Sequence, residues 1–282
     1  MNTYPFRLGT TSYIIPADIL PNVRYLAGKV QDVELVLFEV DDGPNNLPGH
    51  EQITELAGIA SEHSMTFTVH LPLDLRLAED GSSRHVSLDK ARRVIDRTGK
   101  LDPWAYVLHL DGKLVRHGAR PEIMKRWRDH AVYSLEIVGG WAGGIEKLAV
   151  ENMEGYPLDF YEPVLERITV SRAVDVGHLW LDHHDPVAYL RKALSRTRVI
   201  HLHGIAGRDH QSLAHVPAEK LSAVLDELVR ADYRGVLTVE VFSEDDFLSS
   251  CAAITTAVNA RHNVDPACAG GKRKLKIGKE NV

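Results

Sequence analysis

Eight short apolar runs recur along the chain, and longer stretches with helical periodicity separate them. This alternation limits the possible folds more than any other feature of the sequence. The runs are nearly continuous, as expected of strands buried on both faces of a parallel sheet that helices cover. They comprise Phe6–Ser12, Val33–Val40, Thr66–His70, Ala105–Leu110, Leu148–Glu151, Ser171–Asp175, Val199–His203 and Gly235–Val241.

The stretches between the runs carry helix signals, including a proline or a capping residue near the start. Eight strand–helix units close naturally into a barrel, whereas an open doubly wound sheet more often has about five to seven strands and a Gly-rich phosphate-binding turn, which is missing here. We therefore predict an α/β fold of the parallel (β/α)8 TIM-barrel type, with an open α/β sheet as the alternative. The expected helices are Leu47–Ser64, Leu88–Thr98 with Ser87 as its cap, Arg120–Ile137 and Ala218–Ala231.

The length of 282 residues fits one such barrel, which commonly needs about 250 residues. We expect residues 1–266 to form the barrel. Residues 267–282 hold five lysines and arginines and little that could pack in a core, so we expect a disordered basic tail. Its charges serve solvation, or they contact an anionic ligand or partner.

Charge and composition exclude several classes of function. The formal net charge of −6 gives no strong positive field, so we expect no nucleic-acid partner. The two cysteines, Cys251 and Cys268, are not spaced as a disulfide framework or a zinc knuckle. No apolar run approaches the roughly 18 residues of a membrane span, and no signal peptide is evident. We expect a cytoplasmic protein that does not bind a membrane.

Six successive apolar runs, the third to the eighth, bring an imidazole or a carboxylate to the end of a strand. In a parallel barrel these strand ends form one rim, where active sites are built. Three carboxylates at one rim would repel one another unless a cation neutralises them, and a mixture of histidines and carboxylates suits zinc, manganese, iron or cobalt. The predicted metal ligands are His70, His109, Glu151, Asp175, His201 and Glu240.

Further polar residues on the following loops extend this predicted site. His178 and His210 are candidate ligands of another ion, with hydrogen-bonded loop histidines as the alternative. His203 would face the same side of its strand as His201, so it is a ligand, a partner of a ligand or a substrate contact. Glu39 ends the second run and contacts substrate or metal, or simply begins a polar turn.

The number of ligands bears on the reaction class. Eight candidate ligands exceed the four to six that one ion takes, which favours two or three divalent ions. A polynuclear centre of this kind is suited to phosphate-ester hydrolysis. A single ion with a flanking acid and base would instead suit the isomerisation or epimerisation of a sugar.

The motifs Thr-Val-His70, Leu-His109, Val-Glu151-Asn, Asp175-x-x-His178 and Val-Glu240 resemble the xylose-isomerase-like TIM-barrel superfamily, and more closely the apurinic endonucleases of the endonuclease IV type. The resemblance implies one zinc at His70, His109 and a bridging Glu151, and a second at Glu151, Asp175, His201 and Glu240. The third ion of that family uses the counterpart of His178 and an Asp-x-His element. Here Arg208-Asp209-His210 displaces that aspartate by one position, which puts the third ion in doubt.

The segments Arg7–Asp18 and Phe38–Asn46 resemble a narrower branch, the cobamide-remodelling phosphodiesterases. This resemblance implies hydrolysis of the nucleotide-loop phosphoester of a cobamide, which yields cobinamide phosphate and the riboside of the lower ligand. In this hypothesis Glu151 and Glu240 are the catalytic carboxylates. The expected substrate-binding residues are Asn152, His203, Arg208 and Glu39.

Overall fold

The chain forms a closed parallel barrel of eight strands, seen in a computed structural model that describes residues 4–38, 45–73, 75–77, 79, 82 and 85–262. The predicted (β/α)8 TIM barrel is thus confirmed. The strands are β1 Arg7–Thr11, β2 Asp32–Val36, β3 Thr66–His70, β4 Tyr106–Leu108, β5 Leu148–Glu151, β6 Ser171–Asp175, β7 Thr197–Leu202 and β8 Val236–Val239. Glu39 and the predicted tail 267–282 lie outside the described residues.

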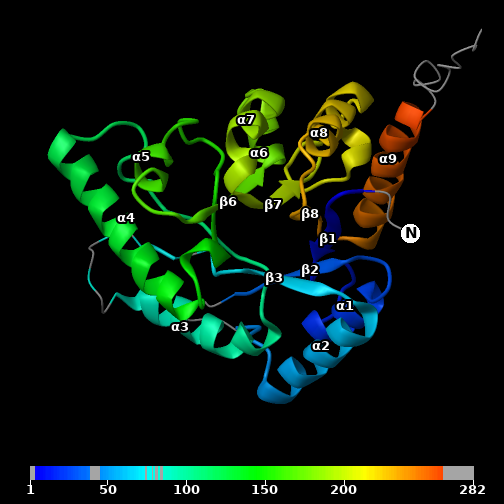
Figure 1. The fold of residues 1–282 in the computed structure, drawn as a ribbon, viewed down its shortest axis with the longest axis horizontal. Helices are drawn as coiled ribbons and strands as arrows, with labels where there is room; N and C mark the ends of the chain where they lie inside the picture. Colours follow the sequence, from blue (N-terminus) through cyan, green and yellow to red (C-terminus); the bar gives the residue numbers. More distant parts are fainter. Residues whose placement is uncertain are drawn as a thin grey trace, which may run out of the picture.

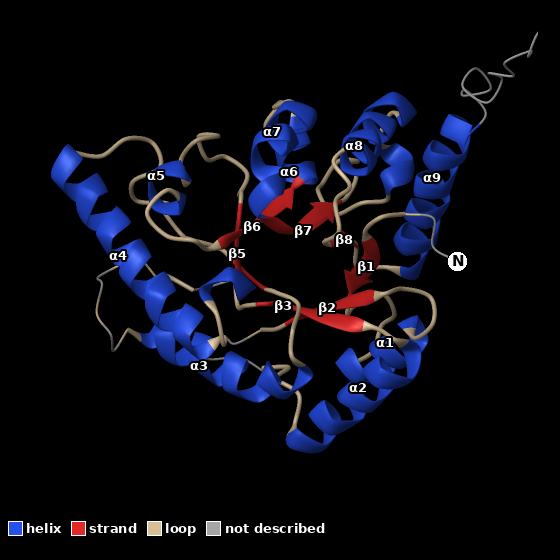
Figure 2. Cartoon of the chain, in the orientation of Figure 1, coloured by secondary structure: helices blue, strands red, loops and turns tan. Residues whose placement is uncertain are grey.

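Helices surround the barrel on its outside, and the strands form a ring in the middle of the molecule (Figures 1 and 2). The apolar faces of the helices pack on the outward side chains of the strands and form the main core. The helices are α1 Ile19–Leu26, α2 His50–His63, α3 Val86–Thr98, α4 Pro121–Trp141, α5 Glu162–Leu165, α6 Val176–Leu181, α7 Pro186–Ala193, α8 Ala218–Arg230 and α9 Glu244–His262. Within the described residues, no helix is long and apolar enough to cross a membrane.

The ends of several elements differ from those predicted. The strand that we placed at Gly235–Val241 covers only Val236–Val239, so Glu240 lies one residue beyond it. Helix α3 begins at Val86, and the side chain of His85 accepts a hydrogen bond from the Ser87 backbone, so His85 and not Ser87 is the cap. A histidine at this position was missed because it is not among the preferred capping residues.

The amino-terminal end of the barrel is closed by an aromatic and cationic stack. The guanidinium groups of Arg7 and Arg198 lie 3.8 and 4.1 Å from the centroid of the Trp104 ring. The Trp104 indole N–H also donates to the Arg198 carbonyl at 3.0 Å. Small inward residues, Ala149 and Ala173 among them, pack beside Trp104. Packed side chains therefore fill the amino-terminal end of the barrel, and the predicted metal ligands lie toward its carboxyl-terminal end.

Candidate metal centre

The predicted ligands meet at the carboxyl-terminal end of the barrel because strand register aligns them. Asp175 at the end of β6 pairs directly with His201 of β7, and His70 at the end of β3 pairs with Val107 of β4. Strand alternation turns these side chains inward. The resulting ligand atoms lie within 4.8 Å of one another in three groups, which are His70/His109/Glu151, Glu151/Asp175/His201/Glu240 and His178/His203/His210.

Glu151 belongs to two of these groups, and each of its carboxylate oxygens faces a different one. Oε2 lies 3.3 Å from His70 Nε2 and 3.1 Å from His109 Nε2. Oε1 lies 3.2 Å from His201 Nδ1. The other ring nitrogen of His70 donates to the Leu71 carbonyl at 2.7 Å, which directs Nε2 at the carboxylate. A carboxylate divided in this way has the arrangement needed to bridge two cations.

The second group contains buried carboxylate oxygens without hydrogen-bond partners among the described residues. Asp175 Oδ2 and Glu240 Oε2 are both in this condition. Glu240 Oε2 lies 3.2 Å from His201 Nδ1, and Asp175 Oδ2 lies 4.0 Å from the same atom. Leaving buried carboxylate oxygens unpaired is costly unless a cation or a proton binds between them.

The third group consists of three imidazoles, and it includes His203, which we had assigned to substrate binding. The His203 ring is fully buried, and its Nδ1 accepts from the His210 backbone N–H at 3.1 Å. Its Nε2 lies 3.3 Å from Asp175 Oδ1 and makes no hydrogen bond within the described part of the chain. Its ring centroid lies 5.8 Å from that of His178 and 4.3 Å from that of His210. This burial favours a ligand role over direct substrate contact. The displaced Asp209 is not part of the group.

A glycine makes room for His203. A Cβ atom on Gly177, in the first turn of α6, would lie 2.1 Å from the His203 ring. The imidazole can therefore reach this position only because residue 177 has no side chain. Asp175 caps the same helix by accepting from the His178 backbone N–H at 2.7 Å, which ties the second group to the third.

We had expected Asn152 to bind the substrate, but its side-chain amide is already hydrogen-bonded within the protein. Its Nδ2 donates to the Asp175 carbonyl at 2.9 Å, and its Oδ1 accepts from the Asp175 backbone N–H at 2.9 Å. The Asn152 carbonyl also accepts from His178 Nδ1 at 2.9 Å, assuming that this nitrogen carries the proton. Asn152 thus positions two candidate ligands.

Glu34 is a functional candidate that the search of strand ends missed, because it lies in the middle of β2. It is fully buried, and its Oε2 lies 2.9 Å from His201 Nε2, while Nδ1 of the same ring faces the ligand group. Carboxylates commonly hold the distal nitrogen of a metal-binding histidine in this manner. The signal in the sequence was a single acidic residue at an inward position of an apolar run.

The pKa values in the cluster reflect its excess of carboxylates. Burial would lower the pKa of His70, but the hydrogen bond and charge of Glu151 outweigh it and raise this pKa to about 9. Burial would raise the pKa of Glu151, yet the charges of His201 and His109 hold it well below its usual value. Positive charge is therefore favoured at this rim, whether it comes from protons or from cations.

The donor set fits divalent first-row ions. Imidazole and carboxylate ligands suit zinc, manganese, iron or cobalt, and the unpaired buried oxygens and nitrogens point at one another. Arg208, on the loop after β7, is exposed and has no acidic partner among the described residues. Its guanidinium is thus available to an anionic group near the rim.

Comparisons with known proteins agree with this architecture. Residues 29–264 match the family model of the xylose isomerase-like TIM barrel. A sequence comparison with curated proteins found no match.

Solved structures share the fold at low sequence identity. A D-tagatose 3-epimerase-like protein has a TM-score of 0.72 and 16% identity, covering 92% of this chain and 99% of its own. The 3-keto-D-glucoside 4-epimerase of E. coli has a TM-score of 0.68 and 15% identity, with coverages of 90% and 99%. Endonuclease IV from Thermus thermophilus has a TM-score of 0.65 and 15% identity, also with 90% and 99%.

Proposed function

The chain belongs to the family of xylose isomerase-like TIM barrels, and on this premise we propose that it is a divalent-metal-dependent phosphodiesterase. The observation that carries the proposal is the division of Glu151 between His70 and His109 on one oxygen and His201 on the other. A single ion would need only one of these two carboxylate oxygens with its neighbouring histidines. The adjoining imidazole group at His178, His203 and His210 offers a further site.

The residues of the chain take distinct roles in this proposal. The ions would be held by the three ligand groups, and when bound they supply charge for the phosphoryl oxygens and lower the pKa of water. Glu151 orients the attacking water, and Glu240 at the mouth receives its proton. Arg208 binds a phosphate oxygen, for which the planar guanidinium is well matched. The water oxygen bonds to phosphorus as the bond from phosphorus to the riboside oxygen breaks, and the riboside oxygen takes up a proton from Glu240 or from solvent.

We propose a cobamide as the substrate, with its nucleotide-loop phosphoester as the bond that is cut. The resemblance of Arg7–Asp18 and Phe38–Asn46 to cobamide-remodelling phosphodiesterases supports this substrate. So does the rim of the barrel, where Phe38, Leu73 and Phe242 are exposed on the loops that follow β2, β3 and β8. Apolar side chains grouped around a polar centre favour a large amphiphilic ligand.

The test is incubation of the metal-replete protein with a complete cobamide, followed by mass spectrometry. We expect cobinamide phosphate to appear, and to disappear with a chelator. Glu151→Ala should lose both bound metal and hydrolysis, whereas Glu62→Ala on the exposed face of α2 should retain both. Hydrolysis and metal content that survive in Glu151→Ala would refute the proposal.

A second candidate function is a sugar isomerase or epimerase with a single metal ion. The epimerases among the solved structures favour it, and the four ligands Glu151, Asp175, His201 and Glu240 suffice for one ion. Metal analysis separates the candidates, since one ion per chain supports the epimerase and two or three support the phosphodiesterase. A ketohexose substrate should then be epimerised by the same preparation that leaves cobamides intact.

A further inference from the structure

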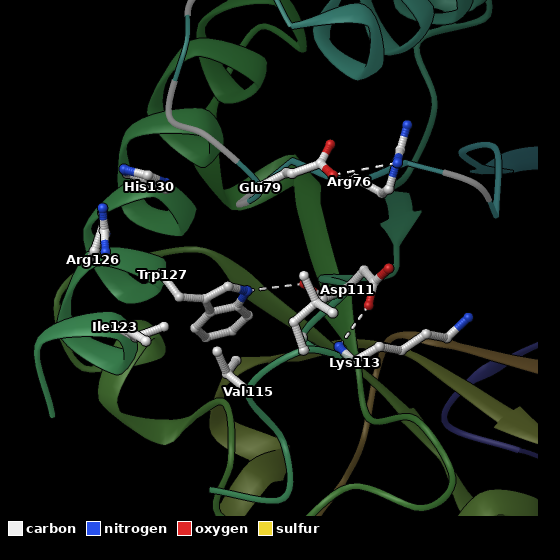
Figure 3. Close-up of a pocket in the computed structure, with 11 residues that line it drawn as sticks. Arg76, Glu79, Asp111, Lys113, Val115, Ile123, Arg126, Trp127 and His130 are labelled. Atoms are coloured by element: carbon white, nitrogen blue, oxygen red, sulfur yellow. Dashed lines mark hydrogen bonds and ion pairs between the residues drawn. The ribbon is translucent and has the colours of Figure 1, made fainter. Parts of the chain in front are cut away.

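A cavity of about 750 Å³ is lined by residues that follow β3 and β4, at the carboxyl-terminal end of the barrel where the candidate metal ligands also lie. Three segments line it, namely the loop after β3, the loop after β4 and the amino-terminal half of α4 (Figure 3). The ligand groups described above contribute none of its lining residues. It is thus a separate binding feature of the same end of the molecule.

One wall of the cavity is apolar and firmly held. The buried Trp127 indole lies in it beside Ile123 and Val115 (Figure 3). The indole N–H donates to the Asp111 carbonyl at 3.0 Å, and the ring packs against Phe160 with centroids 4.9 Å apart. These contacts fix the plane of the indole before any ligand arrives, which lowers the cost of binding a flat apolar group.

The β4–α4 loop packs tightly against this wall. A Cβ atom on Gly112 would lie 2.4 Å from the Phe160 ring and 3.2 Å from the Trp127 ring. The Gly112 backbone N–H also donates to the Tyr156 hydroxyl at 3.1 Å. The loop thus forms a second fixed wall, and Leu114 and Lys113 extend from it at the mouth of the cavity.

The charged residues of the cavity leave a small positive balance, because Arg76, Lys113 and Arg126 face only two lining carboxylates, Glu79 and Asp111. Arg76 and Glu79 form an ion pair at 3.3 Å on one side. Arg126 and Lys113 line other parts of the cavity, and neither has an acidic side-chain partner among the described residues. A ligand with a flat apolar part and an attached anionic group would complement both the indole wall and these cations.

The position of the cavity relates it to the metal centre. Asp111 and Gly112 in its wall follow the candidate ligand His109 by only two and three residues. At about 3.3 Å per residue, this corresponds to roughly 7–10 Å of chain at most. The edge of the cavity formed by Asp111 and Gly112 is therefore close to His109, and a group joined to a phosphodiester at the ligand cluster would extend toward this edge.

We propose that this cavity binds the heteroaromatic base of the nucleotide part of the substrate. The base packs against the wall formed by Trp127 and Ile123, and Arg126 lies beside the anionic groups of the same nucleotide. The inference rests on the proposed phosphodiesterase function, because it places the scissile phosphate at the ligand cluster. Selection among bases then takes place at residues of α4 and the β4–α4 loop, remote from the metal ligands.

The experiment is calorimetric titration of the metal-replete chain with adenosine monophosphate. Ile123→Trp places a second indole over the Trp127 wall and blocks that face, and Arg126→Glu reverses a charge of the cavity, so each should weaken binding at least tenfold. Lys125→Glu is the matched control, because it changes the same charge on the neighbouring residue of α4 without lining the cavity, and its binding should be unchanged. No detectable binding, or equal binding in all four proteins, would overturn the inference.

Cobamide hydrolysis by the same proteins distinguishes this inference from the function on which it rests. We expect Arg126→Glu to raise KM at least tenfold while kcat changes less than twofold. If nucleotide binding depends on Arg126 but no cobamide is hydrolysed, the binding role of the cavity is supported and the phosphodiesterase proposal is refuted. If cobamide is hydrolysed and neither variant changes KM, the phosphodiesterase proposal is supported and the binding role of the cavity is refuted.

Discussion

The buried pair of Glu34 and His201 determines which ring nitrogen the cluster receives. Glu34 Oε2 accepts from His201 Nε2 at 2.9 Å, so Nδ1 is left as the nitrogen that faces Glu151 and Glu240. A carboxylate in this position also makes the imidazole a better ligand. The identity of residue 34 should therefore affect metal affinity although it does not touch the metal.

We expect Glu34→Gln to weaken metal binding at the Glu151/Asp175/His201/Glu240 group by about 10- to 100-fold. Competition with a coloured chelator measures this affinity. Glu62→Gln on the surface of α2 is the control and should bind as the unmodified chain does. An unchanged affinity in Glu34→Gln would mean that Glu34 only fills space.

Asp32, two residues before Glu34 on β2, makes the stability of the folded state depend on pH. Burial is the largest cause that raises its pKa, to about 7, although hydrogen bonds from Thr66 and Thr68 and the charge of Arg7 act against it. Because the folded pKa exceeds the unfolded one, the folded state holds the proton between about pH 4 and pH 7. Stability from this group thus falls as the pH rises through that window.

Asp32→Asn should accordingly be more stable than the unmodified chain at pH 8, by on the order of 4 kcal/mol at most, since one pKa unit corresponds to about 1.4 kcal/mol. The advantage should shrink as the pH falls toward 4. Urea unfolding at several pH values measures the difference, and comparing the two proteins at each pH cancels the other titrating groups. A variant that is less stable at pH 8 would show that ionised Asp32 pairs productively with Arg7.

At the scale of elements, the contact between α6 and β7 decides whether the third ligand group can form. A Cβ on Gly177 would lie 2.1 Å from the His203 ring. We expect Gly177→Ala to displace this ring and to lower the bound metal by one ion per chain. Atomic absorption on dialysed protein gives the count.

Gly140→Ala is the matched control for this substitution. Residue 140 also lies in a helix, α4, and an added Cβ would meet nothing within 4 Å. Its metal content should equal that of the unmodified chain. The same metal content in Gly177→Ala would show that His203 is not a ligand.

The strands and their order could be predicted from the sequence because both faces of each strand are buried and the runs are therefore apolar. The short helices α5 and α6 were not predicted, since four to six residues give too little periodicity to recognise. The six ligands at strand ends came from the same pattern. Glu34 could not be predicted, and the sequence left a ligand role of His203 as one of three alternatives, because both depend on side chains that meet across the barrel from distant strands.

At the scale of the whole molecule, metal binding of the proposed kind would be linked to folding stability. The candidate ligands come from four strands, from α6 and from the residues that follow β4, β7 and β8, so bound ions would hold the folded state together. An ion present at 100 times its Kd contributes about 2.7 kcal/mol, and each kcal/mol changes Tm by about 2–4 °C in a chain of this size.

Removal of metal with a chelator should therefore lower Tm by about 5–10 °C for each ion lost. Differential scanning fluorimetry measures the change. Glu151→Ala serves as the control, because a chain that has already lost its ions should respond little to the chelator. A Tm that is unaffected in the metal-replete chain would argue against resident ions.

The pairing of β1 with β8 has a consequence for when the candidate metal centre can form. Thr10 lies opposite Val239, and Glu240 follows immediately, so the last ligand is in place only after the two ends of the barrel have joined. During synthesis the chain must therefore emerge from the ribosome at least through β8 before this can happen. Uptake of metal would then mark the final step of maturation, and a chain that terminates before Glu240 would emerge without a complete centre.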